Sequence, residues 1–413
     1  MRHLLNHKVA VVGAGMTRFH HRLHAEKNSR ELFVEAALEA VDSVDKGMTL
    51  KDIESLYVGN FSSDLFEKQC HVAALMADWL GINPVPAVRI EDACASSGIA
   101  MQMGVLGIAS GAFDVLMVGG VEKMRTLSTE AVTDTLAMAS DQIYEASVGM
   151  TFPGLYAAMA SAHFAKYGST WEQLCAIAIK NHHNATMNPK AHFQEEIMDI
   201  AKRSGAQRGL TFNNEIEFLK SPLNPPVAYP LKLYDCCPVS DGAAAVILAS
   251  EEVAKRYTDT PILVKGIGQA SDTMALHNRE DLTTLRATVL AAKKAYEMAG
   301  MGPRDMDFAE VHDCFTIAEV LATEDLGFFP KGQGGKAAEE GRTALNAEVS
   351  VNPGGGLKAK GHPVGATGAA MVYEVFKQLR GKAGSAQVKD AETGLIHNVG
   401  ASGGTVVVQV YGR

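Results

Sequence analysis

The sequence predicts a layered α/β fold made of two similar halves, with a further unit inserted into the first half. Strand-like runs alternate with helix-like segments along the chain, a pattern typical of α/β proteins. Segments of the first part of the chain match segments of the last part at nearly constant spacings, which indicates a duplication. A length of 413 residues gives room for about three compact units at ~150 residues each.

The matching segments occur in the same order in both halves. The pairs are 12–15 (VGAG) with 265–268 (KGIG), 51–54 (KDIE) with 304–307 (RDMD), 97–101 (SGIAM) with 367–371 (TGAAM), and 118–119 (VG) with 399–400 (VG). The first pair follows β-branched runs, and we interpret its glycines as a turn after a strand. Two α/β halves pack most economically face to face, with helices between them.

An insertion interrupts the first half. The strand that closes this half, near 242–248, corresponds to 404–410 at the end of the chain. The inserted stretch has a helix-like segment at 170–184 among proline-rich turns. We therefore predict three units, namely an N-terminal half at 1–120 with 240–260, an inserted unit at 121–239, and a C-terminal half at 261–413.

Composition restricts the partners and the compartment. The chain has 38 basic and 47 acidic residues, a net charge of −9, which repels phosphate backbones and anionic lipids, so we expect neither nucleic acid nor membrane binding. The segment Met1–His7 leads into a strand-like run without the apolar stretch of a secretory signal. Six cysteines, with no C-x-x-C pair, are too few for a disulfide scaffold. We expect a cytoplasmic protein.

Cys94 is the first candidate for chemistry. It ends a strand-like run and precedes small residues that can open a helix. At a helix N-terminus, unpaired amides and the helix dipole favour a thiolate over a thiol, so Cys94 is predicted to be a nucleophile. The alternative is a buried structural cysteine, which is the commonest role of this residue type.

A glycine-rich segment at 351–368 surrounds His362. It lacks the Lys-Ser or Lys-Thr pair of a phosphate-binding loop. Close approach to substrate is easy at such a segment, so His362 can accept the proton of a thiol or donate to an oxyanion. A plain glycine-rich turn with a solvated histidine is the alternative.

His312 and Cys314 follow a strand-like run and precede a helix-like one, a position where α/β proteins gather ligands. No second thiol lies at metal-ligand spacing, so we predict no metal site. The remaining histidine groups are expected on solvated faces; they are His20, His21, His24, His182 and His183.

Gly400 lies in a run of small residues, Asn398–Gly404. Its backbone amide and that of Cys94 can form a pair of oxyanion donors if the two segments converge. The segment Gly13–Arg18 begins like a dinucleotide fingerprint, but Arg18 stands where the third glycine belongs.

Taken together, these motifs resemble the thiolase superfamily. They are Cys94 in DACASSG, His312 and Cys314 in HDCF, His362 in GHP, the run Asn398–Gly400, and YDCCPVSDGAAA at 234–245. The HDCF motif, with asparagine at 398 where other thiolases keep a cysteine, is similar to the sterol-carrier-protein type thiolases and their bacterial and archaeal relatives, which are acetyl-CoA acetyltransferase-like.

The resemblance implies a fold, a reaction and a set of roles. The fold would be the five-layered αβαβα thiolase fold, with an inserted loop domain that binds coenzyme A. Cys94 would carry the acyl group, His362 would activate it, and His312 would hold a water in an oxyanion hole. Cys314 would be the second acid and base, and the amides of Cys94 and Gly400 would form the other hole. Coenzyme A would be a substrate, with no separate cofactor.

The reaction implied is the reversible thiolytic cleavage of a β-ketoacyl-CoA, or its reverse, a Claisen condensation of acyl-CoAs. Two alternatives are a decarboxylating ketoacyl-synthase-like condensing enzyme and a non-catalytic acyl-CoA-binding subunit. The resemblance further implies a homodimer or tetramer and a small zinc-ribbon and OB-fold partner protein. The acyl chain and the direction of the reaction stay open.

Overall fold

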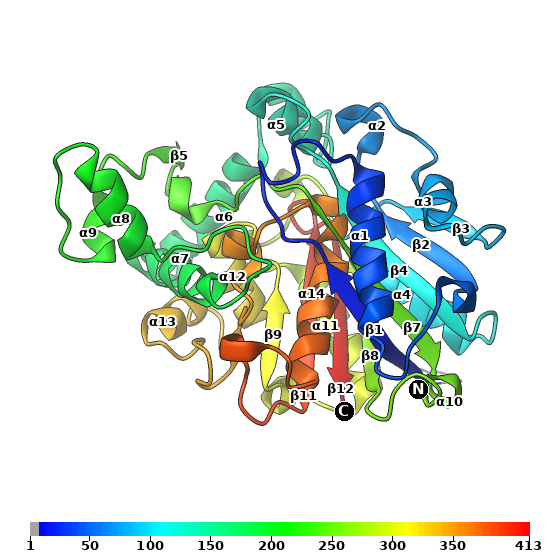
Figure 1. Ribbon diagram of the computed structural model, residues 1–413. Helices are drawn as coiled ribbons and strands as arrows, with labels where there is room; N and C mark the ends of the chain where they lie inside the picture. Colours follow the sequence, from blue (N-terminus) through cyan, green and yellow to red (C-terminus); the bar gives the residue numbers. More distant parts are fainter. Residues whose placement is uncertain (1–7) are drawn as a thin grey trace.

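Ten strands form one mixed sheet in the computed structural model, which describes residues 8–413 (Figure 1). The segment Met1–His7, on which the expectation about a secretory signal depends, lies outside the described residues. The strands are β1 (Val9–Met16), β2 (Ser55–Gly59), β3 (Ala87–Ile90), β4 (Val115–Glu122), β7 (Gly242–Ser250), β8 (Ile262–Ser271), β9 (Phe308–Val311), β10 (Ser350–Val351), β11 (Thr393–Gly400) and β12 (Thr405–Gly412). Their spatial order is β10-β9-β11-β12-β8-β1-β7-β4-β2-β3.

This order consists of two equivalent sets of five strands. The first set is β3-β2-β4-β7-β1 and the second is β10-β9-β11-β12-β8. The sets meet where β1 pairs with β8 through only two residue pairs, Ala10 with Leu263 and Val11 with Ile262. Each strand of the first set has a counterpart in the second, so β1 matches β8, β4 matches β11 and β7 matches β12. The predicted duplication is confirmed.

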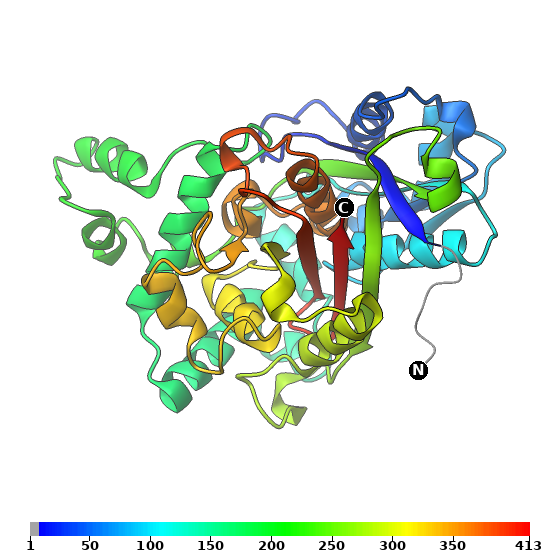
Figure 2. The same ribbon diagram turned by 90° about the horizontal axis from the view of Figure 1, so that it is seen from below.

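Helices complete five layers. α4 (Ser96–Ala109) and α14 (Thr367–Leu379) contact each other and strands of both sets, and they form the central layer. α1 (Ser29–Asp42) covers β1 and β7 on the outside, and α11 (Arg286–Ala299) covers β8 and β12 (Figures 1 and 2). Shorter helices flank these layers; they are α2 (Ser63–Phe66), α3 (Val72–Leu80), α10 (Glu251–Ala254), α12 (Thr316–Asp325) and α13 (Gly334–Glu339).

The repeated glycine pairs lie inside strands, so their interpretation as turns is wrong. β1 runs straight through Gly15, and β8 runs through Gly268. A Cβ atom on Gly15 would lie 2.3 Å from the carbonyl oxygen of Ala36 in α1, and one on Gly268 would lie 2.0 Å from that of Ala291 in α11. Glycine is needed here because the outer helix touches the strand backbone, and the same need in both halves explains the repeat.

The segment between β4 and β7 is mostly helical. It holds α5 (Thr129–Ala137), α6 (Phe152–Tyr167), α7 (Trp171–Thr186), α8 (Ile197–Ala206), α9 (Glu215–Lys220) and a hairpin of β5 (Pro226–Ala228) and β6 (Leu231–Lys232). α6 and α7 pack against α12, whereas α8 and α9 extend away from the sheet at one end of the molecule (Figures 1 and 2). The helix expected near 170–184 is α7, which starts after a capping box between Thr170 and Gln173.

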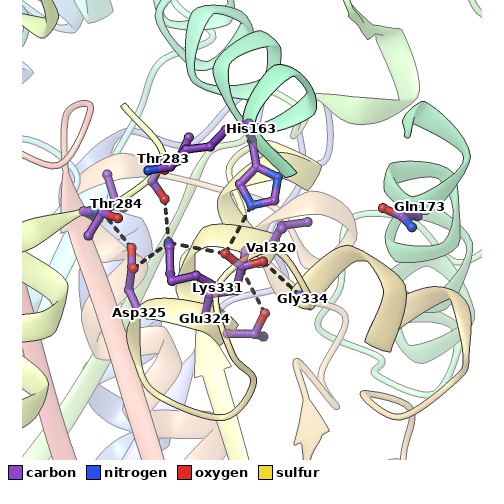
Figure 3. Close-up of polar contacts among 12 residues, drawn as sticks. His163, Gln173, Thr283, Thr284, Val320, Glu324, Asp325, Lys331 and Gly334 are labelled. Carbon is purple, nitrogen blue, oxygen red and sulfur yellow. Dashed lines mark hydrogen bonds and ion pairs between the residues drawn. The ribbon is translucent and has the colours of Figure 1, made fainter. Parts of the chain in front are cut away.

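A buried contact between a histidine and a carboxylate joins α6 to the second half (Figure 3). His163 of α6 lies 3.1 Å from Glu324 of α12, with both side chains fully buried. Lys331 lies 3.3 Å from Glu324 and 2.8 Å from Asp325. The contact between His163 and Glu324 thus ties α6 to α12, while Lys331 pairs with the two buried carboxylates of α12. No helix within residues 8–413 is both long and apolar enough to span a membrane.

Candidate active site

The loops that carry the predicted site residues meet at one place. Cys94 lies between β3 and α4, His312 and Cys314 lie between β9 and α12, and His362 precedes α14. The sulfur of Cys94 and one ring nitrogen each of His312 and His362 lie within 4.8 Å of one another. Cys94, Cys314 and His362 all line one cavity. Three motifs that are up to 268 positions apart thus converge.

Cys94 is a thiol at rest, contrary to the expected thiolate. Burial raises its pKa to about 12, and this effect outweighs the opposing contribution of the Ala401 amide; the carboxylate of Glu122 acts in the same direction as burial. Cys94 lies two residues ahead of Ser96, where α4 begins. The helix dipole therefore stabilises a thiolate only from a distance. The cost of desolvating the charged sulfur is larger than this stabilisation.

His362 is placed as a base. Its Nδ1 lies 2.7 Å from the hydroxyl oxygen of Thr367, and that hydroxyl donates to the carbonyl of Pro363 at 3.0 Å. Because the hydroxyl proton of Thr367 is already donated to the carbonyl of Pro363, the hydroxyl oxygen must accept a hydrogen bond from His362. Nδ1 of His362 therefore carries the ring proton. The lone pair of the ring is then on Nε2. Burial lowers the pKa of His362 to about 3, so the ring is neutral and able to accept a proton from Cys94.

His312 has the opposite tautomer. The amide nitrogen of Asn398 donates to Nδ1 of His312 at 3.2 Å and to the carbonyl of Cys94 at 3.0 Å. The ring proton is therefore on Nε2, which is buried and has no hydrogen-bond partner among residues 8–413. Burial and the neighbouring His362 lower the pKa of His312 well below its usual value. The site thus holds two neutral imidazoles in opposite tautomers, with a lone pair on Nε2 of His362 and a proton on Nε2 of His312.

Asp313 fixes the segment between His312 and Cys314. Its carboxylate accepts the amide of Leu357 at 2.6 Å and the side-chain amide of Asn181 at 2.7 Å. The first bond ties this segment to the glycine-rich one that leads to His362, and the second ties it to α7. Burial raises the pKa of Asp313 to about 7, which shows how costly an ionised carboxylate is at this depth.

Cys314 is buried, and burial raises its pKa well above the usual value. Its sulfur lies beside the hydroxyl of Tyr156 in α6, which donates to the carbonyl of Ala401 at 3.1 Å. Sequence reasoning missed Tyr156. It lies in a helix of the insertion with no motif around it, so nothing in the sequence pointed to its role.

Gly400 ends β11 and packs against the turn of Cys94, where a Cβ atom on Gly400 would lie 2.9 Å from the carbonyl oxygen of Asp92. The amide that contacts the sulfur is that of the next residue, Ala401. The pairing of the amides of Cys94 and Gly400 as oxyanion donors stays a prediction.

The cavity at Cys94 has a volume of about 170 Å³ and is mostly apolar. Its wall includes aromatic and aliphatic side chains from the insertion and both halves, namely Phe61, Met124, Leu136, Phe152, Tyr156, Val239, Phe315 and Val364. Cys236 and Cys237, which were not predicted as site residues, also line it. An apolar wall around a few polar groups is typical of a small-molecule site.

The prediction that five histidines lie on solvated faces is wrong for two of them. His24 and His182 are buried, at 2% and 0% exposure. His182 packs against Phe193 and its Nδ1 lies 3.2 Å from the carbonyl of Glu195. Periodicity cannot reveal such burial, because long-range packing of the insertion covers these side chains.

Comparisons with known proteins agree with this geometry. Residues 9–252 match the family described as "Thiolase, N-terminal domain", and residues 268–413 match "Thiolase C-terminal domain-like". An acetyl-CoA acetyltransferase of Methanothermobacter thermautotrophicus is 46% identical, over 98% of this chain and 99% of the relative. Sterol carrier protein 2 of Homo sapiens is 32% identical, over 98% of this chain and 72% of the relative.

Solved structures share the fold. The Ltp2-ChsH2(DUF35) aldolase has a TM-score of 0.79 at 23% identity, with 99% of each chain covered. Human mitochondrial 3-ketoacyl-CoA thiolase in complex with CoA has a TM-score of 0.70 at 19% identity, with 100% of this chain and 99% of that chain covered. The thiolase fold expected from the motifs is confirmed, and the chain belongs to the thiolase family.

Proposed function

We propose that the protein is an acyltransferase thiolase that cleaves or forms a short β-ketoacyl-CoA through an acyl group on Cys94. The observation that carries this proposal is the convergence of the Cys94 sulfur with His312 and His362 within 4.8 Å, in an apolar cavity that Cys314 also lines. A nucleophile, a base, a hydrogen-bond donor and a second thiol are the groups that this chemistry requires.

Acylation starts from a neutral pair. Nε2 of His362 takes the proton of Cys94 as the sulfur attacks the keto carbonyl, so charge develops only during the reaction. The backbone amides of Cys94 and Gly400 are proposed to hold the resulting oxyanion. Collapse of this intermediate breaks the carbon–carbon bond, leaves the shorter acyl group on sulfur and releases the enolate of an acyl-CoA.

The enolate needs a hydrogen-bond donor and a proton. Nε2–H of His312, which has no hydrogen-bond partner within the described part of the chain, residues 8–413, is placed to donate to the enolate oxygen directly or through a water. Cys314, whose raised pKa keeps it protonated, supplies the proton to carbon. The resulting thiolate then takes the proton of coenzyme A, whose sulfur attacks the acyl group on Cys94 and frees the enzyme.

The acyl group is proposed to be short, as in acetoacetyl-CoA. The relative at 46% identity is named acetyl-CoA acetyltransferase. The cavity of about 170 Å³ is close in size to one of ~150 Å³ that admits benzene, which suits a four-carbon ketoacyl group and disfavours long chains. Rates of thiolysis across acetoacetyl, long-chain and aromatic β-ketoacyl-CoA esters test this order.

The alternatives fit the site less well. A decarboxylating condensing enzyme generates its carbanion without a second thiol, yet Cys314 lines the cavity with Cys94. A non-catalytic acyl-CoA-binding subunit has no need of the two tautomers that Thr367 and Asn398 fix. Alkylation distinguishes the two catalytic functions from the non-catalytic one. Both catalytic functions require that iodoacetamide modifies Cys94, in a reaction that slows in a His362→Gln variant.

The two thiols are predicted to act at different steps. Cys94→Ser should abolish acyl transfer. Cys314→Ala should still be acetylated on Cys94 by acetyl-CoA, but it should lose at least ~100-fold in acetoacetyl-CoA cleavage, as expected when a general acid or base is removed. Mass spectrometry of the intact protein measures acetylation, and thiolysis is followed by loss of acetoacetyl-CoA.

The matched control is Cys175→Ala, since Cys175 is a buried cysteine in the core of the insertion and does not line the cavity. The Cys175→Ala protein should keep both the acetylation of Cys94 and the cleavage of acetoacetyl-CoA. Thiolysis at the wild-type rate in the Cys314→Ala protein would remove Cys314 from the mechanism, and acetylation of the Cys94→Ser protein elsewhere in the cavity would remove Cys94.

A homo-oligomer is proposed from the exposed edge of the sheet. β3 is the outermost strand, and Val88 on it is 48% exposed. Trp79, Met103 and Leu106 on the adjoining helices α3 and α4 are also exposed. An unpaired apolar edge of this kind is a place where a second copy can add its own strand.

We predict that Val88→Lys shifts the oligomer toward the monomer, because the charge opposes burial of the edge. Light scattering after size-exclusion chromatography measures the mass. Leu210→Lys, at a residue with a similar exposure of 46%, is the control and should leave the mass unchanged. A monomeric wild-type protein would contradict the proposal.

A small partner protein with a zinc ribbon and an OB fold is also proposed. The support is the motif set and a structural neighbour named with a DUF35 component. Co-purification of a stoichiometric small subunit from the native cell tests it, and full activity of the chain alone counts against it.

The six cysteines, all within residues 8–413, are unpaired, which supports the expected cytoplasmic location.

A further inference from the structure

Three histidines outside the active site converge on one another. His20 and His21 follow β1, and His192 lies in the segment between α7 and α8. One nitrogen from each ring lies within 4.8 Å of the others. The rings are nearly parallel, with interplanar angles of 12° to 19° and centroids 4.6 to 4.8 Å apart. Nδ1 of His21 and Nε2 of His192 are only 2.7 Å apart.

Hydrogen bonds orient the lone pair of His192 toward this cluster. Nδ1 of His192 lies 2.8 Å from the hydroxyl oxygen of Ser240, which itself donates to the carbonyl of Pro238 at 3.2 Å. Ser240 therefore accepts from Nδ1–H, and Nε2 of His192 carries a lone pair that points at His21. A second bond that fixes the tautomer of a ligating histidine is the usual surrounding of a protein metal site.

We propose that His20, His21 and His192 bind a divalent transition-metal ion of the Zn²⁺ type. On binding, the ion takes the place of the single proton that bridges His21 and His192, and this proton moves to Nε2 of His21, so the charge balance needs no other reactant. His20 joins as third ligand when its proton moves to Nδ1. The exposed amides of Arg22 and Leu23, which now donate to Nδ1 of His20, then lose this acceptor, and this loss weakens the binding of the ion.

The ligand set selects the class of metal. Three imidazoles suit Zn²⁺, Ni²⁺ or Cu²⁺ and are poor ligands for Mg²⁺ or Ca²⁺. Arg18 and Arg125 lie close enough to repel a dication, and we therefore expect micromolar rather than tighter binding.

The site joins segments that hold the catalytic loop. The amide of His192 donates to the carbonyl of Lys360 at 2.9 Å. Ser240, the partner of His192, packs directly against Gly361, where a Cβ atom would lie 2.8 Å from its hydroxyl. His362 is the next residue. A bound ion would therefore stabilise the insertion against the first half immediately behind the base of the active site.

The experiment is a titration with Co²⁺ and Zn²⁺ in a Cys94→Ala protein. This background is needed because Cys94, His312 and His362 also present three donor atoms together. We expect one ion per chain by calorimetry, a rise in Tm with added Zn²⁺, and visible Co²⁺ bands without the near-ultraviolet charge-transfer band of a thiolate ligand.

Variants of the ligands decide the proposal. His192→Gln and His21→Gln should each weaken binding at least about 100-fold, and Ser240→Ala about 10- to 100-fold, as expected for a residue that orients a ligand. The control is His183→Gln, because His183 is an exposed histidine on α7 that pairs with Glu196. It should bind as the parent does.

Two outcomes would overturn the inference. One is unchanged affinity in a His21→Gln protein whose circular dichroism spectrum is native. The other is loss of all binding in the Cys94→Ala background, which would assign the ion to the catalytic cluster. Neither outcome bears on acyl transfer, so failure here is distinct from failure of the proposed function.

Discussion

Tyr156 connects two parts of the site that the motifs alone treat as separate. Its hydroxyl contacts the sulfur of Cys314 and donates to the carbonyl of Ala401, whose amide contacts the sulfur of Cys94. When Cys314 is a thiol it can donate to the Tyr156 oxygen, and when it is a thiolate the hydroxyl can donate to sulfur instead. Tyr156 is thus suited to position Cys314 in both of its protonation states.

We predict that Tyr156→Phe lowers kcat for acetoacetyl-CoA thiolysis about 5- to 10-fold, because one hydrogen bond to the reacting thiolate is worth about 1 kcal/mol or slightly more. KM and the acetylation of Cys94 by acetyl-CoA should change little. Tyr296→Phe is the control, since the Tyr296 hydroxyl makes a similar bond to Leu326 at 3.1 Å far from the cavity wall. Equal losses of kcat in both variants would show that Tyr156 has only a general structural role.

At the scale of elements, the contact between α4 and α14 sets the geometry of the site, because Cys94 precedes α4 and His362 precedes α14. The two helices cross at glycines. A Cβ atom on Gly368 would lie 2.2 Å from the amide nitrogen of Gly98, and one on Gly98 would lie 2.4 Å from the side-chain oxygen of Asn398. This close approach requires that both positions lack a side chain.

We predict that Gly368→Ala destabilises the protein by about 1 to 3 kcal/mol and separates Cys94 from His362. In an open helix, alanine in place of glycine would stabilise by about 1 kcal/mol, so a loss shows that overpacking prevails. Chemical denaturation measures it. Gly107→Ala in α4 is the control, since its nearest neighbour would be 3.5 Å away. Similar stability of both variants would contradict the close crossing.

At the scale of the whole molecule, burial of neutral histidines makes the fold sensitive to acid. Among residues 8–413, six histidines are buried and have pKa values below the usual range; they are His24, His182, His192, His312, His362 and His397. In the unfolded chain each binds a proton near pH 6.5. Below that pH the unfolded state binds more protons than the folded state, so the free energy of unfolding falls as the pH falls.

His397 offers a clean test, because burial lowers its pKa to about 3 and it touches Thr288 rather than the cavity. Between pH 7.5 and 5.5 one such histidine accounts for about 1.4 kcal/mol of lost stability. We predict that His397→Gln reduces the loss between these two pH values by that amount in chemical denaturation. The exposed variant His183→Gln should keep the wild-type loss, and an unchanged loss in His397→Gln would contradict the prediction.

The sequence was sufficient for much of the site and little of its electrostatics. Cys94, His312, Cys314 and His362 are recognisable because each lies in a short motif whose residues are adjacent in the chain. Tyr156 was not recognisable, since its partners lie more than 150 positions away. The predicted protonation state of Cys94 was wrong because a helix end is a local feature, whereas desolvation depends on every segment that closes over the sulfur.

The amino-acid sequence by itself determined the duplicated α/β architecture, the order of its elements and the residue types of the site, since periodicity, repeats and motifs are properties of neighbouring residues. The tertiary structure alone decided the tautomers of His362 and His312, because Thr367 and Asn398 assign their ring protons. It also decided that His20, His21 and His192 converge. Such outcomes depend on contacts between distant segments, and only packing of the folded chain brings those contacts about.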